Sequence, residues 1–167
     1  IGKTLLLDTF YYFLPFKDKW RTHFLPFMRD VHAQLHAMQG LPDPLWQIAK
    51  QWAKKTRVIC FDEFLVEDIA DAALLGGLLD ALFQQGICVI FTSNFAPDEL
   101  YKKGLQRELF LPTIDKIKQH TDTIHLTIHS DYRTSSLPKT DYYWYPLTTL
   151  SRDKLQANFD ALTQSQI

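Results

Sequence analysis

The sequence has little of what marks several functional classes. Its 167 residues include only two cysteines, Cys60 and Cys88, and each stands in an apolar run, so we expect reduced thiols in the core and no disulfide. No apolar run reaches membrane-spanning length, because Asp80 interrupts the longest candidate. The net charge of −1 gives no basic excess for binding nucleic acid. No basic segment followed by an apolar stretch opens the sequence, so we expect no signal peptide within it.

What is present suits one globular α/β domain. Hydrophobic residues make up 46% and charged residues 22% of the chain, which is enough apolar material for a sizeable core. The central feature is the apolar run Val58–Phe61, which is rich in β-branched and aromatic residues. Such a run, bounded by charge, predicts a strand that is buried on both faces.

Two carboxylates, Asp62 and Glu63, follow this strand directly. Ligands of open α/β sheets bind at the carboxyl ends of the strands. Mg²⁺ prefers hard oxygen ligands, and an attacking water needs a base within hydrogen-bond reach, so the pair fits the Walker B pattern of P-loop ATPases. The plainer alternative is a buried strand followed by a helix with an acidic first turn.

The first four residues, Ile1-Gly2-Lys3-Thr4, match the end of the P-loop pattern G-x-x-x-x-G-K-[ST]. In that motif backbone N–H groups surround the phosphates, the lysine contacts the β- and γ-phosphates, and the hydroxyl binds Mg²⁺. Apolar residues at helical spacing follow from Leu5 to Leu14, as the motif requires. The alternative is an ordinary helix start with a threonine near its cap.

Thr92-Ser93-Asn94 follow a second predicted buried strand, 87–91. At this sheet edge an Asn94 amide can donate to a γ-phosphate and orient a water molecule, whereas the alternative is a simple turn. Gly76 and Gly77 lie inside a predicted helix, 67–85, and indicate close packing of that helix against the sheet. The other predicted elements are a strand at 20–24, helices at 27–38, 45–53 and from Pro97, an amphipathic stretch to 119, an edge strand at 123–129 and a last helix capped by Ser151.

Taken together, these motifs resemble the AAA+ ATPases, and more specifically the ZapE-type family. The similar segments cover residues 2–133: His23-Phe24, Phe27-Met28, Val31-His32, Phe61 to Ala72, Leu74 to Leu78, Thr92 to Asn94, Pro97 to Tyr101, Gly104 to Arg107, Phe110 to Pro112 and Asp131 to Arg133.

The resemblance implies an α/β fold: a P-loop NTPase of the AAA+ core type, with a parallel sheet flanked by helices. It implies Ile1, Gly2, Lys3 and Thr4 on ATP, and Thr4 with Asp62 on Mg²⁺. It assigns Glu63 as base, Asn94 as sensor and Arg107 as arginine finger, with Arg133 as the competing finger. Residues 1–150 are expected to be a partial core that starts inside the P-loop and lacks its first strand, and 151–167 the start of a helical segment whose lid lies beyond.

The resemblance further implies a homo-oligomer that hydrolyses ATP and remodels a protein partner, plausibly at the bacterial cell-division ring. Bacterial members are cytoplasmic and eukaryotic relatives mitochondrial, and peripheral membrane association stays open. Two alternatives remain: a DNA-associated ATPase of the helicase-loader type, and a non-enzymatic module that binds no nucleotide. The near-neutral charge argues against the first.

Overall fold

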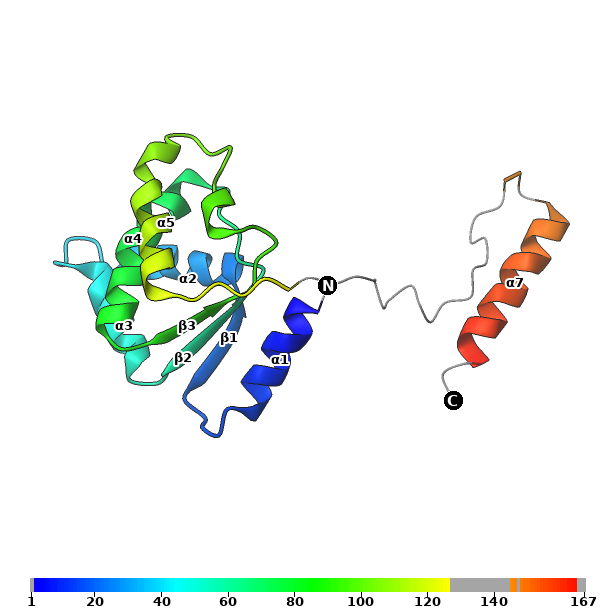
Figure 1. The fold of residues 1–167 in the computed structure, drawn as a ribbon, viewed down its shortest axis with the longest axis horizontal. Coiled ribbons are helices and arrows are strands. Elements are labelled where there is room, and N and C mark those ends of the chain that lie inside the picture. Colours follow the sequence, from blue (N-terminus) through cyan, green and yellow to red (C-terminus); the bar gives the residue numbers. More distant parts are fainter. Residues whose placement is uncertain (1, 127–144, 147, 165–167) are drawn as a thin grey trace. The chain divides into compact units, whose positions relative to one another are not determined.

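The computed structural model describes residues 2–126, 145–146 and 148–164, with side chains described through residue 160. The chain divides into two compact units, residues 1–126 and 127–167, and each is described by itself (Figure 1). In the described residues no helix has both the length and the apolar character needed to cross a membrane.

The first unit contains a three-stranded parallel sheet. Its strands are β1 (Lys19–His23), β2 (Val58–Asp62) and β3 (Cys88–Phe91), in the order β1-β2-β3. All five residues of β2 are buried, because this strand lies between two others and under helices on both faces. The predicted buried strand and its two parallel neighbours are confirmed.

Helices lie on both faces of this sheet (Figure 1). Alternate residues of β2 divide the core: Ile59 and Phe61 belong to the larger cluster, whereas Val58 and Cys60 pack with Leu7. The predicted parallel sheet flanked by helices is therefore confirmed. The helices are α1 (Lys3–Phe13) on the Leu7 side, and α2 (Phe24–Ala37), α3 (Pro44–Ala53), α4 (Ile69–Gln84) and α5 (Leu111–His120).

Polar caps explain where α4 begins. The Asp68 carboxylate accepts a 2.7 Å hydrogen bond from the Ala70 N–H and a 3.4 Å bond from the Asp71 N–H, which satisfies two of the free donors of the first turn. The helix starts two residues later than the sequence predicts. Further along the chain, the proline at 97 starts only a short 3₁₀ turn, η1 (Pro97–Glu99), and a second turn, η2 (Arg107–Leu109), precedes α5.

The packing of the two helical glycines corrects one prediction. A Cβ at Gly76 would lie 2.6 Å from Thr113 Oγ1 of α5, and a Cβ at Gly77 would lie 3.1 Å from a Leu45 methyl of α3. The two glycines do mark close packing of α4, but their contacts are with α5 and α3 and not with the sheet. The small glycine surface lets these helices lie side by side.

The exposed edge of the sheet corrects two further predictions. Among the described residues β3 pairs only with β2. Cys88 is therefore exposed and the next three residues are half-buried, where a buried strand and a core thiol were expected. Residues 123–126 form no strand, because they make no ladder pairing with β3 or with any other described strand. Positions 127–129 of the expected edge strand lie outside the described residues.

The second unit contains α7 (Thr149–Gln164), which starts two residues before the expected position. Thr148 and Ser151 cap it reciprocally: the Thr148 N–H donates to Ser151 Oγ over 2.7 Å, and the Ser151 N–H donates to Thr148 Oγ1 over 3.3 Å. The N-cap residue is thus Thr148, and not Ser151 as predicted. Ser151 is buried in the first helical turn and is its hydrogen-bond partner.

Candidate functional site

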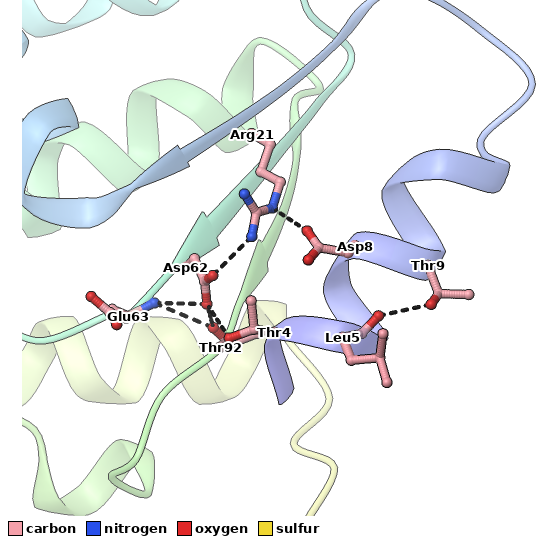
Figure 2. A network of polar contacts seen from close by, with 8 residues as sticks. All are labelled: Thr4, Leu5, Asp8, Thr9, Arg21, Asp62, Glu63 and Thr92. Atoms are coloured by element: carbon pink, nitrogen blue, oxygen red, sulfur yellow. Dashed lines mark hydrogen bonds and ion pairs between the residues drawn. The ribbon is translucent and has the colours of Figure 1, made fainter. Parts of the chain in front are cut away.

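Asp62, the last residue of β2, is the centre of a polar network (Figure 2). The residue is only 2% exposed, so its carboxylate depends on protein partners. Its Oδ1 accepts hydrogen bonds from Thr92 Oγ1 at 2.6 Å, from the Glu63 N–H at 3.2 Å and from Thr4 Oγ1 at 3.3 Å. Its Oδ2 accepts a 2.9 Å hydrogen bond from Arg21 Nη2. The fold thus unites residues from four segments that are distant in sequence.

Glu63 turns away from this buried group. Its φ is +55°, a left-handed conformation that few non-glycine residues adopt, and its side chain is 77% exposed. Its N–H lies 3.3 Å from Thr92 Oγ1 as well as near Asp62, so the backbone is held from both sides. Its carboxylate Oε2 lies 3.5 Å from His23 Nδ1. The two adjacent carboxylates therefore differ: that of Asp62 is buried and hydrogen-bonded, and that of Glu63 is open to solvent beside His23.

Gly2 caps the N-terminus of α1 in a left-handed conformation, with φ of +87°. Such a φ strains any residue with a side chain, which fits the last glycine of a P-loop. The first N–H groups of α1 have no partner within the helix, so this end suits an anion. Lys3 and Thr4 follow in the first turn, and Thr4 reaches Asp62. Ile1 lies outside the described residues.

A groove of about 760 Å³ runs beside this helix end. Lys3, Leu7 and Phe10 line it from α1, residues 89–94 from β3 and its following loop, and residues 120–126 from the other side. Ser93 fixes that loop through two hydrogen bonds. Its hydroxyl donates one of 2.8 Å to the Phe64 carbonyl and accepts one of 3.1 Å from the Phe95 N–H. Asn94 is exposed between these anchors and lines the groove together with Lys3, whereas Thr4, Asp62 and Glu63 are not among its lining residues.

The donor set fits Mg²⁺. Among the described residues no group of three or more His, Cys, Asp and Glu side chains could hold a metal ion, so a transition-metal cage is not indicated there. Thr4 and Thr92 hydroxyls contact the Asp62 carboxylate instead, and these are hard oxygens. Mg²⁺ typically binds one or two such protein oxygens and completes its shell with water and substrate phosphates.

Arg107 stands apart from this group. It is half-buried at the start of η2, and its Nη2 donates a 2.7 Å hydrogen bond to the Asp98 carbonyl. In the part of the chain that the structure describes, no hydrogen bond or ion pair joins it to Asp62, Glu63 or Thr4. Arg133 lies outside the described residues.

Sequence reasoning missed Arg21, Asp8 and the role of Thr92. Arg21 Nε lies 2.8 Å from Asp8 Oδ1, while its Nη2 contacts Asp62, so one guanidinium joins α1 to β2 (Figure 2). One sequence signal could have indicated Arg21. It is a charged residue inside a predicted strand, and that strand was expected in the same sheet as the strand that ends at Asp62. Its direction could not be read from the pattern, since that needs the register Arg21↔Cys60.

Cys60 lies two positions before Asp62 and has no role in this network. It is fully buried against Leu7 and Val58. Burial raises the pKa of its thiol to about 11; the nearby Cys88 adds to the rise, and Arg21 and Lys19 partly oppose it. Because the thiolate is the reactive form, this cysteine is an inert core residue.

Comparison with known proteins identifies one family and several similar sequences. The model of the family described as "AFG1-like ATPase" matches residues 1–167. "Cell division protein ZapE" of Escherichia coli (strain K12) is 50% identical over 161 residues, covering 96% of this chain and 42% of that protein. "Lactation elevated protein 1 homolog B" of Danio rerio is 42% identical over 155 residues, covering 86% of this chain and 31% of that protein. The chain thus spans less than half the length of these relatives. No solved structure matches.

Proposed function

This chain belongs to the AFG1-like ATPase family, and from that premise we propose that its residues form one side of an ATP-hydrolysing site. The observation that carries the proposal is the contact between Thr4 Oγ1, in the first turn of α1, and Asp62 Oδ1, at the end of β2. Fifty-eight positions separate the two residues in sequence. A helix end suited to phosphate and a carboxylate suited to Mg²⁺ thus meet at one point.

Phosphate binding is assigned to the start of α1. The free backbone N–H groups after Gly2 would surround the phosphates, and the ammonium of Lys3 would neutralise the β- and γ-phosphate charge. Thr4 and Asp62 would hold Mg²⁺, Asp62 through water because its oxygens already have protein partners. The bound ion supplies charge neutralisation on the phosphates.

Hydrolysis is assigned to Glu63 and Asn94. The exposed Glu63 carboxylate would accept a proton from the attacking water, whose oxygen then bonds to the γ-phosphorus while the bond to the ADP oxygen breaks. The Asn94 amide, presented by the loop that Ser93 anchors, would orient that water. Products are ADP, inorganic phosphate and a proton.

Assembly into a homo-oligomer is part of the proposal, because Arg107 has no contact with the Asp62 group of its own chain in the described residues. Its guanidinium would neutralise γ-phosphate charge in a neighbouring copy, a role worth about 10³–10⁵ in rate. The hydrolysis cycle would remodel a protein partner. A relative named "Cell division protein ZapE" supports a partner at the bacterial division ring, and hence a cytoplasmic site of action.

The test is nucleotide binding and phosphate release by the purified full-length protein that contains residues 1–167. Lys3→Ala should weaken ATP binding at least tenfold, while Lys17→Ala, an exposed lysine after α1, should leave it unchanged. Equal binding by the Lys3 variant, or no ATP binding by the unaltered protein, would contradict the proposal.

A further inference from the structure

Arg21 lies in β1, one strand away from the residues that the sequence motifs identify. The register pairs Arg21 with Cys60, so its long side chain runs forward along the sheet to reach the end of β2. There it occupies the space between two carboxylates, with Nη2 2.9 Å from Asp62 Oδ2 and Nε 2.8 Å from Asp8 Oδ1 (Figure 2). Two different nitrogens of one planar group thus contact two different elements.

Asp62 depends on this contact. The hydrogen bonds from Thr4, Thr92 and the Glu63 N–H all end on Oδ1, whereas Oδ2 contacts Arg21. With the side chain only 3% exposed, little water can take the place of the guanidinium. A buried charge left without its partner is strongly disfavoured, so without Arg21 the carboxylate would turn from its present orientation.

Asp8 determines what kind of effect Arg21 has. It lies one turn after Thr4 on α1, so both residues stand on the face of the helix that meets β2. Its carboxylate balances the Arg21 charge, and the positive charge therefore does little to repel a cation at Thr4. The main effect of Arg21 is therefore to orient the Asp62 carboxylate and to link it to α1.

We propose that Arg21 is a positioning residue that fixes the Asp62 carboxylate for Mg²⁺ and, through Asp8, holds the phosphate-binding end of α1 beside it. The inference deepens the proposed function and rests on it. A lysine is not an equivalent replacement, because its one nitrogen cannot occupy both positions that Nη2 takes at Asp62 and Nε takes at Asp8.

The experiment measures binding of a fluorescent ATP analogue while Mg²⁺ is titrated from an EDTA baseline. Loss of such an outer contact typically costs about 10–100-fold in metal affinity. Arg21→Gln and Arg21→Lys should each raise the Mg²⁺ concentration of half-maximal binding about tenfold, with binding in EDTA changed less than threefold. Asp8→Asn should give a smaller shift in the same direction. Arg29→Gln, an exposed arginine on α2, is the matched control and should show none.

A second measurement does not need nucleotide. Melting temperatures of Arg21→Gln, Asp62→Asn and the double variant form a cycle, and the double variant should lose less than the sum of the two single losses. Either of two results overturns the role of Arg21. One is a double variant whose loss equals the sum of the single losses; the other is a Mg²⁺ midpoint in Arg21→Lys that is equal to or below that of the unaltered protein. Failure of the unaltered protein to bind ATP counts against the proposed function, and the cycle then decides the Arg21 contact alone.

Discussion

The Thr92 hydroxyl donates a 2.6 Å hydrogen bond to Asp62 Oδ1, which joins the loop after β3 to the end of β2. Thr92 also lies 3.3 Å from the Glu63 N–H, and its own backbone N–H donates to the Phe61 carbonyl. One side chain therefore supports both acidic positions of the proposed site. Residues of the chain itself therefore hold the carboxylate in place.

Replacing Thr92 by valine keeps the shape and removes the hydroxyl. We expect the free energy of unfolding to fall by about 1.5–3 kcal/mol, the usual range for a hydrogen bond to a charged group. Thr92→Ser should lose much less, since it keeps the donor. Urea unfolding measures both. Equal losses in the two variants would show that the methyl group, and not the hydroxyl, provides the stability.

Glu63→Gln keeps the side-chain shape and removes the base. The variant should bind ATP with Mg²⁺ as the unaltered protein does and release phosphate at least a hundredfold more slowly, since base catalysis contributes about 10²–10⁴ in rate. The matched control is Glu67→Gln, an exposed glutamate four residues later. Turnover at the normal rate in Glu63→Gln would show that another group accepts the proton.

The finger role of Arg107 is tested by mixing two inactive variants. Arg107→Ala alone should bind ATP normally and hydrolyse it poorly. Mixed with Glu63→Gln protein, it should regain some activity, because one interface in a mixed assembly then combines an intact base with an intact finger. Lys102→Ala, which removes an exposed lysine paired with Glu99, is the control. An assembled mixture with no recovery, or full activity of Arg107→Ala alone, would rule out a finger acting between subunits.

The two thiols should react differently. Cys88 is exposed and should be alkylated by iodoacetamide at pH 8, whereas Cys60 is buried with a pKa of about 11 and should resist until the protein unfolds. Because the ordinary pKa is 9.0 and folding raises it, protonated Cys60 supports the fold below pH 9, and this contribution is lost between pH 9 and 11. Mass spectrometry of the modified peptides separates the two sites. Rapid labelling of Cys60 in the folded protein would contradict its burial.

Gly76→Ala should destabilise the protein although alanine favours helices by about 1 kcal/mol over glycine. The added Cβ would lie 2.6 Å from Thr113 Oγ1, and overpacking of this kind costs about 1–3 kcal/mol. A second change, Thr113→Ala, should restore much of the loss by removing the atom in contact. Thermal melting of the single and double variants checks this. If the stability losses of the two single variants simply add in the double variant, contact with Thr113 is not the cause of the strain.

Sequence patterns predicted the parallel strands and most helices because apolar periodicity reports burial. The resemblance to the ZapE-type family implied that Thr4 and Asp62 share one Mg²⁺ site, and the two side chains are in contact. Sequence patterns could not give Arg21, whose target depends on strand register, or the partner of Gly76, which depends on which helices meet. Residues 123–126 alternate like an edge strand, yet a strand also needs a neighbour to pair with, and alternation alone does not supply one.

The attachment of α1 to the sheet has a consequence for motion. Leu7 is its only fully buried residue, while Leu5, Tyr12 and Phe13 are largely exposed, so apolar packing holds this helix weakly compared with α4. Elements with few buried contacts open first in local unfolding, and their amide hydrogens exchange soonest. A ligand that binds only the closed helix end would slow this exchange in proportion to its occupancy. Amide exchange along α1 would therefore report the proposed nucleotide binding, even in variants designed to stop hydrolysis.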